Sequence, residues 1–146
     1  MMQYIEPYYI NLLIALALGV IIGLERTIAH KTAGMRTYGL VSMGSCLFII
    51  LSQLAIADSG LYNFDPMRTA AGIIMGIGFL CGGVIIFQNH ELTGLTTAAG
   101  LWVSAGIGMA VGFGQVGLAT FATIITLVVF TLLWTVEHLI TKRKEK

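Results

Sequence analysis

Five long stretches without a single charged side chain dominate this sequence. They cover about residues 8–24, 38–57, 69–87, 95–113 and 116–136. A helix needs roughly 20 apolar residues to cross a hydrocarbon core, and one charge at its centre costs at least about 2.5 kcal/mol. Because lipid offers backbone amides no partner, such segments should be helical. The pattern predicts an all-α membrane protein, a bundle of about five transmembrane helices forming a single domain over residues 1–146.

The composition leaves little room for a soluble enzyme or a nucleic-acid binder. Charged residues make up 10% of the chain and hydrophobic residues 57%, whereas soluble domains carry about 25% charged residues. The net charge of +1 provides no basic surface for phosphates. No hydrolase or kinase motif appears, and Cys46 and Cys81 have no neighbour at metal-ligand spacing. We expect no catalytic residue, metal or cofactor, and we expect both cysteines to be packing residues, with a disulfide as the alternative.

The positive charges are strongly skewed between the two predicted sides. Seven of the eight Lys and Arg residues lie in the first loop or near the C-terminus, and only Arg68 lies opposite. The positive-inside rule therefore predicts an N-terminus outside and a C-terminus in the cytoplasm. Residues 137–146 form a basic tail, interpreted as a stop-transfer flank or, alternatively, as a contact to anionic lipid.

Small residues recur every four positions in three of the predicted spans, which aligns them along one helix face. Such faces let helix backbones approach closely in membranes. We expect glycine-mediated packing within the chain, with a homodimer or higher oligomer as the alternative use of a face left over. The sequence leaves open whether spans three and four are continuous, joined through 88–91, or broken. The residues concerned are Ala15, Gly19 and Gly23, then Gly72, Gly76, Gly78 and Gly82, then Thr96, Gly100, Ser104, Gly108 and Gly112.

One group of polar residues is expected on the cytoplasmic side. Glu25, Arg26 and Arg36 flank the first loop. They are either interfacial anchors that reach water or a buried network that fixes the bundle or faces a ligand. Thr96 and Thr97 open the fourth span on the same side, as ordinary capping residues or as donors to an anion at a helix N-terminus. The two sets could converge on one pocket.

A second polar group precedes the third span on the outer side. Asp65 suits an N-cap and Pro66 the first helical position. A cation at a helix N-terminus is unfavourable, so Arg68 is expected to pair with Asp65 or Asp58. Helix-start chemistry explains this group, with a site at the outer mouth as the alternative.

Four stretches with these residues occur in a distinctive order. They are Gly19-x-x-x-Gly23-Leu24-Glu25-Arg26, Ala33-Gly34-Met35-Arg36-Thr37, Gly76-Ile77-Gly78-Phe79-Leu80-x-Gly82-x-Val84-Ile85, and Gly94-Leu95-Thr96-Thr97-Ala98-Ala99-x-Leu101-Trp102. Together they resemble the MgtC/SapB family, in its membrane-embedded N-terminal domain. The resemblance implies a multi-pass protein of the bacterial inner membrane, and it places distinctive residues such as Trp102 without assigning any of them a catalytic role.

The family is associated with adaptation to low magnesium and with survival of pathogens inside phagocytes. Longer members append a soluble domain, and we expect this sequence to be a short form without it. The leading hypothesis is a non-enzymatic regulator linked to magnesium and phosphate homeostasis. Its expected partners are membrane lipid and other membrane proteins, contacted within the bilayer. The alternative is a small oligomeric ion transporter or channel.

Overall fold

The computed structural model describes residues 6–59, 65–88 and 91–142. Five helices in this part of the chain are long and apolar enough to cross a membrane, which confirms the predicted number. The last of them changes from α- to π-helical geometry and back without a break. The helical elements are α1 (Glu6–Ile28), α2 (Met35–Ser59), α3 (Pro66–Val84), α4 (Leu95–Gly112), α5 (Val116–Val128), the π-helix η2 (Val129–Leu133) and α6 (Trp134–Lys142).

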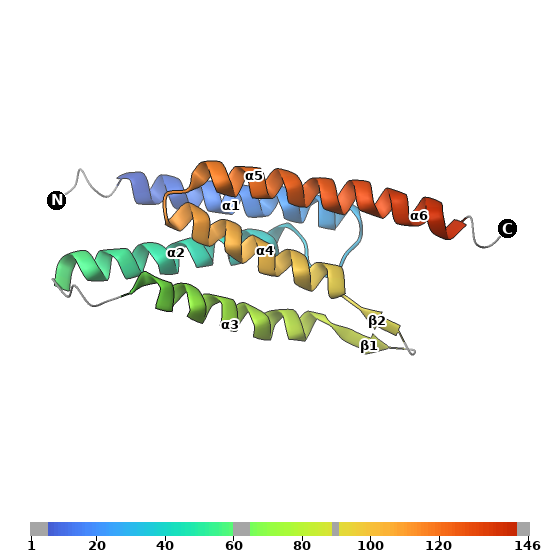
Figure 1. Cartoon of the computed structure of the whole chain (residues 1–146), viewed down its shortest axis with the longest axis horizontal. Helices are drawn as coiled ribbons and strands as arrows, with labels where there is room; N and C mark the ends of the chain where they lie inside the picture. The colour runs from blue at the N-terminus through green and yellow to red at the C-terminus, as the bar shows by residue number, and fades with distance from the viewer. Residues whose placement is uncertain (1–5, 60–64, 89–90, 143–146) are drawn as a thin grey trace.

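Helix α4 is the centre of the bundle. It contacts α1, α2, α3 and α5. In Figure 1, α1 and the continuous helix α5–α6 lie on one side of it, and α2 and α3 lie on the other. Helix α3 stands at the edge, with its main contacts to α4 and α2. The shortest and least apolar of the spanning helices is therefore the one most enclosed by protein.

Two helices of the bundle end in the same hydrogen-bonded turn. At the end of α1, Lys31 N donates to Arg26 O at 2.9 Å and His30 N donates to Thr27 O at 3.1 Å. These are the two bonds of a Schellman cap, whose turning residue is usually a left-handed glycine. His30 adopts that conformation here, with φ 54°. Gly114, with φ 78°, has the same role after α4.

The connection between α3 and α4 differs from the prediction. The third span was expected to reach residue 87, but its helix ends at Val84, and β1 (Ile86–Gln88) pairs antiparallel with β2 (Glu91–Thr93). The reason is local, because the helix-weakening pair Gly82-Gly83 is followed by β-branched residues that favour extended backbone. Spans three and four are both continuous helices, so the broken or re-entrant alternative does not apply.

Small and hydroxyl-bearing residues make up much of the bundle interior, beside buried residues such as Ile22 and Leu101, while many large apolar side chains point outward. Ser42 and Ser104 are fully buried, whereas Leu13 and Phe79 are exposed. In water this distribution would be unfavourable, but hydrocarbon solvates large apolar side chains as well as a protein interior does. The outward face therefore suits lipid.

Glycines allow α4 and α1 to approach α2 closely. A Cβ on Gly108 would collide with the carbonyl oxygen of Ser42. A Cβ on Gly112 would lie 2.8 Å from Ile49 Cβ, and one on Gly19 would lie 2.5 Å from Tyr38 O. Since real Cβ atoms do not approach other atoms so closely, these three positions exclude any side chain.

Helix α3 does not use its glycines in this way. A Cβ at Gly72, Gly76, Gly78 or Gly82 would meet no atom of the described chain within 4 Å. The intra-chain contact expected for them is therefore missing among the described residues, because α3 turns other residues, Ala70 and Ile77, toward the bundle.

Candidate functional site

Arg26 is a charged residue inside the bundle. It is only 3% exposed, and its Nε donates a hydrogen bond to the Glu25 carboxylate beside it. Its guanidinium carbon lies 3.6 Å from the centroid of the Phe130 ring. An ion pair and a cation–π contact offset the cost of removing this charge from water. The anchoring interpretation, in which Arg26 reaches water, is therefore wrong.

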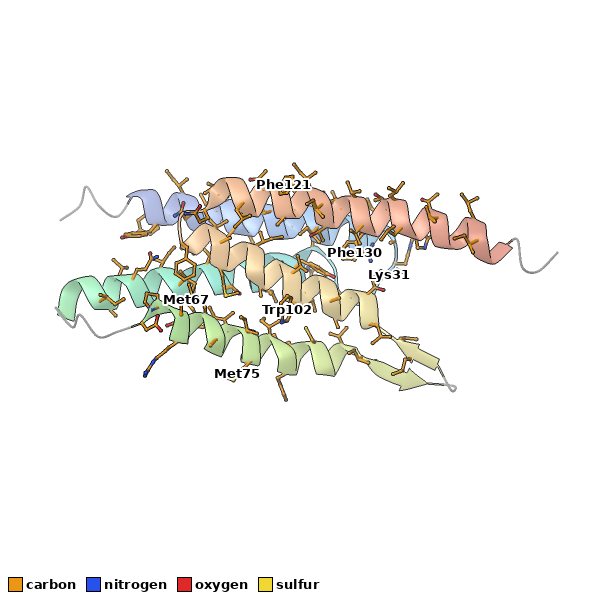
Figure 2. The ribbon with its side chains drawn as sticks, viewed as in Figure 1. Lys31, Met67, Met75, Trp102, Phe121 and Phe130 are labelled. Carbon is orange, nitrogen blue, oxygen red and sulfur yellow. The ribbon has the colours of Figure 1, made fainter. Side chains whose placement is uncertain are left out.

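Phe130 comes from the π-helical segment η2 and is itself buried. Figure 2 shows its side chain directed from η2 toward α4. It fits because α4 presents Gly100, where a Cβ would lie 2.6 Å from Phe130 Cζ and 2.5 Å from the Tyr38 hydroxyl. Single-turn π segments occur frequently at functional sites, and this one holds the ring against the guanidinium.

Tyr38 links α2 to α4 beside this contact. Its side chain is fully buried, and its hydroxyl donates to the carbonyl oxygen of Thr97 at 3.1 Å. In return, Ser104 Oγ donates to Tyr38 O at 3.0 Å. Helix α3 joins the same region through Cys81, whose Sγ donates to Ala98 O at 3.1 Å. We call Glu25, Arg26, Tyr38, Thr97 and Phe130 the polar node.

The polar node contains some of the predicted cytoplasmic residues but not all of them. Glu25, Arg26 and Thr97 belong to it, whereas Arg36 and Thr96 are exposed on the outside of their helices. The expected pocket uniting all five is not formed. The N-cap of helix α4 is Gly94, a left-handed residue with φ 88° that has no side chain to cap the helix, so Thr96 and Thr97 do not cap it.

The outer group is explained by its helix. The Asp65 carboxylate accepts a hydrogen bond from Met67 N at 2.9 Å, and Pro66 opens α3, which confirms the predicted cap. The expected ion pair between Asp65 and Arg68 does not form. Among the described residues, the one salt bridge found is Glu25–Arg26. The alternative partner, Asp58, has a side chain outside the described residues.

Two residues of the polar node were not predicted from the sequence. Tyr38 was seen only as the start of the second span, and Phe130 was hidden in an apolar run. No local signal distinguishes Phe130 from neighbouring apolar residues, since its role depends on the π segment and on Gly100 in another helix. Trp102, singled out by the resemblance, is half exposed on the α3 side of α4 (Figure 2).

The chemistry of the described residues is that of a packed membrane bundle. No group of three or more His, Cys, Asp or Glu side chains with metal-binding geometry occurs in the ranges that the structure covers. Cys46 and Cys81 are free thiols. Five spanning helices around one buried, charge-neutral node define a multi-pass membrane protein.

Comparison with known proteins narrows this class to one family. The model of the MgtC family matches residues 12–139, and the chain belongs to that family. Protein MgtC of Salmonella typhimurium is 48% identical over 121 residues, 83% of this chain and 50% of the relative. The Escherichia coli K12 protein named "Putative magnesium transporter YhiD" is 43% identical over 81% of this chain and 56% of its own length.

The chain spans about half the length of these two relatives. A third relative, from Haemophilus influenzae, is 40% identical over 93% of this chain and 59% of its own length. No solved structure matches the chain. The family assignment therefore rests on sequence, and the resemblance noted from the motifs is confirmed.

Proposed function

We propose that this protein is a non-enzymatic regulator in the bacterial inner membrane, linked to magnesium and phosphate homeostasis and to low-magnesium adaptation or virulence. In this proposal it acts by contacting other membrane proteins within the bilayer. Membership of the MgtC family and the magnesium-related name of one relative support the link to magnesium.

The observation that carries the proposal is the free outer face of α3. Ala71, Gly78 and Gly82 lie on this face and are exposed, and neither glycine has a neighbour within 4 Å of a built Cβ. Figure 2 shows the adjacent Met75 turned away from the bundle. We refer to Ala71, Gly78 and Gly82 as the outer face of α3.

A glycine face directed at lipid has no energetic benefit for the isolated chain. Glycine weakens a helix by roughly 0.5–1 kcal/mol relative to alanine, and it presents no side chain to the acyl chains. A helix of another protein can pack closely against such a face, because small residues allow close backbone contact. The outer face of α3 is therefore suited to a partner helix.

The test is co-purification from native bacterial membranes in a mild detergent. Gly82→Leu should remove the partner, because the leucine occupies the contact surface, while the variant still folds since its Cβ faces open space. The matched control is Gly117→Leu on α5, which also points into open space and should keep the partner. Equal recovery of partners by both variants would contradict the proposal.

A second candidate is an ion transporter or channel, which the name of the Escherichia coli relative favours. It predicts ion flux through the pure protein in proteoliposomes, abolished by Glu25→Gln in the polar node. Robust flux of this kind, together with membranes that yield no partner, would replace the regulator proposal.

A further inference from the structure

A groove runs between α2 and α3 on a side of α3 distinct from its outer face. It has a volume of about 660 Å³, and apolar side chains line most of it. The groove exists because glycines line both walls, and a Cβ at Gly44, Gly72 or Gly76 would meet nothing within 4 Å. Its lining includes Leu40, Val41 and Phe48 of α2 and Gly72, Gly76 and Leu80 of α3.

The length of the groove matches one leaflet of a bilayer. On α3 its lining extends from Thr69 to Leu80, and eleven helical steps of 1.5 Å amount to about 16 Å. The hydrocarbon core is about 30 Å thick, so one leaflet occupies about 15 Å of it. The groove stops short of both ends of α3, so a partner's transmembrane helix would extend beyond it in both directions, whereas an acyl chain of this length can fill it.

The two mouths of the groove differ in charge. One mouth lies near the first turn of α2, and we call it the α2 end. Arg36 lies there, one turn before Leu40, and is exposed, and Lys31 in the preceding connection is exposed as well. Glu25, near the end of the preceding helix, is already bound to Arg26. At the opposite end, Arg68 carries one positive charge and Asp65, which caps α3, carries one negative charge, so the formal charges of these two side chains sum to zero although they form no ion pair. The α2 end is therefore the mouth with excess positive charge among the described side chains.

We propose that this groove holds one acyl chain of an anionic phospholipid, whose phosphate contacts Arg36 at the α2 end. The acyl chain fills the space that the glycines leave open, and the phosphate accepts charge-assisted hydrogen bonds from the guanidinium. This site is independent of the proposed function, which uses the outer face of α3.

The experiment is native mass spectrometry of the whole protein extracted from bacterial membranes, with titration of phosphatidylglycerol and phosphatidylcholine into delipidated protein. We expect about one tightly retained phospholipid per chain and preference for phosphatidylglycerol. Gly76→Leu should abolish retention by filling the groove, with Gly72→Leu as a second variant. Gly117→Leu is the control and should retain the lipid. Arg36→Gln should reduce phosphatidylglycerol retention at least fivefold, and Arg68→Gln should have a much smaller effect.

Folding and oligomeric state must be recorded for the same samples. Circular dichroism and thermal unfolding should show that the glycine variants keep their structure, because the new side chains enter open space. Wild-type retention in both folded glycine variants would overturn the proposal, as would equal effects of Arg36→Gln and Arg68→Gln. A dimer that Gly76→Leu converts to a monomer, without loss of lipid, would show that a second copy of the chain fills the groove instead.

Discussion

The polar node shows how single residues make a buried charge tolerable in this bundle. Arg26 has its countercharge on the preceding residue, so the acid comes from the same helix and not from a neighbouring one. Phe130 covers the guanidinium from another helix. Because a planar guanidinium can bind a carboxylate and stack on a ring together, Lys is no equivalent replacement.

Loss of the guanidinium should destabilise the protein strongly. In Arg26→Gln the half-buried Glu25 carboxylate is left without its countercharge, and breaking a buried ion pair costs about 3 kcal/mol or more. Arg26→Lys keeps the charge but loses the planar stack, so its cost should be smaller. Denaturant unfolding in detergent micelles measures both, with exposed Arg36→Gln as the control. Similar stabilities for Arg26→Gln and Arg36→Gln would contradict this role.

Two buried serines on neighbouring helices should respond differently to the loss of their hydroxyls. Ser104 Oγ donates to Tyr38 O, and losing this bond should lower the free energy of unfolding by about 1 kcal/mol. Ser42 Oγ is the one buried side-chain polar atom in the described part of the chain without a hydrogen-bond partner, so Ser42→Ala should be neutral or stabilising. Thermal unfolding of Ser104→Ala and Ser42→Ala distinguishes them, and equal losses would refute the argument.

For single residues, the sequence predicted which residue types matter better than it predicted which residues they contact. A Glu-Arg pair at the end of an apolar span indicates something unusual, and both residues do lie in the polar node. Arg36 looks equally distinctive in sequence but faces outward. Which face a residue occupies near a helix end depends on the crossing of neighbouring helices, and no local pattern specifies that.

Among the helices, α4 depends most on small residues at its contacts with neighbouring helices. Its Gly100, Gly108 and Gly112 each admit an atom of another helix at a distance that no Cβ would allow. The repeat of four residues in the sequence pointed to such a face. The same repeat in α3 faces open space, so spacing alone does not reveal whether a neighbouring helix is present.

Helix α4 offers a matched pair of glycines for testing this contact. Gly108→Ala should destabilise the bundle by at least about 2 kcal/mol, because the methyl group meets the Ser42 carbonyl and overpacking costs roughly 1–3 kcal/mol. Gly106 lies half a turn away and faces open space, so Gly106→Ala should be neutral or stabilising through helix propensity. Unfolding measured in one detergent compares the two variants. Equal stabilities would rule out the close α2–α4 contact.

Helix boundaries were predicted well where apolar length decided them and poorly where backbone preference did. Hydropathy identified all five helices because hydrocarbon thickness sets their length. It could not locate the end of α3, since Val84, Ile85 and Ile86 are as apolar as the helix before them. Hydropathy did not reveal η2 either, because this π-helix contains no unusual residue type.

For the molecule as a whole, orientation in the membrane is a prediction from charge. The Lys31–Arg36 connection should face the cytoplasm and the segment before α3 the outside. In a Cys46→Ala, Cys81→Ala background, a membrane-impermeant maleimide should label Asp65→Cys in right-side-out spheroplasts. Lys31→Cys should react only after permeabilisation. The reverse labelling pattern would invert the topology.

The central position of α4 has a consequence for biogenesis. This helix emerges from the ribosome after α1, α2 and α3, yet it provides the acceptor for the Tyr38 hydroxyl and the surface on which three earlier helices converge. Until it enters the bilayer, α1 and α2 can pack on each other, but α3 lacks its main contact and the Tyr38 hydroxyl lacks its acceptor. We therefore expect nascent chains stalled before residue 95 to stay associated with the insertion machinery or to be degraded.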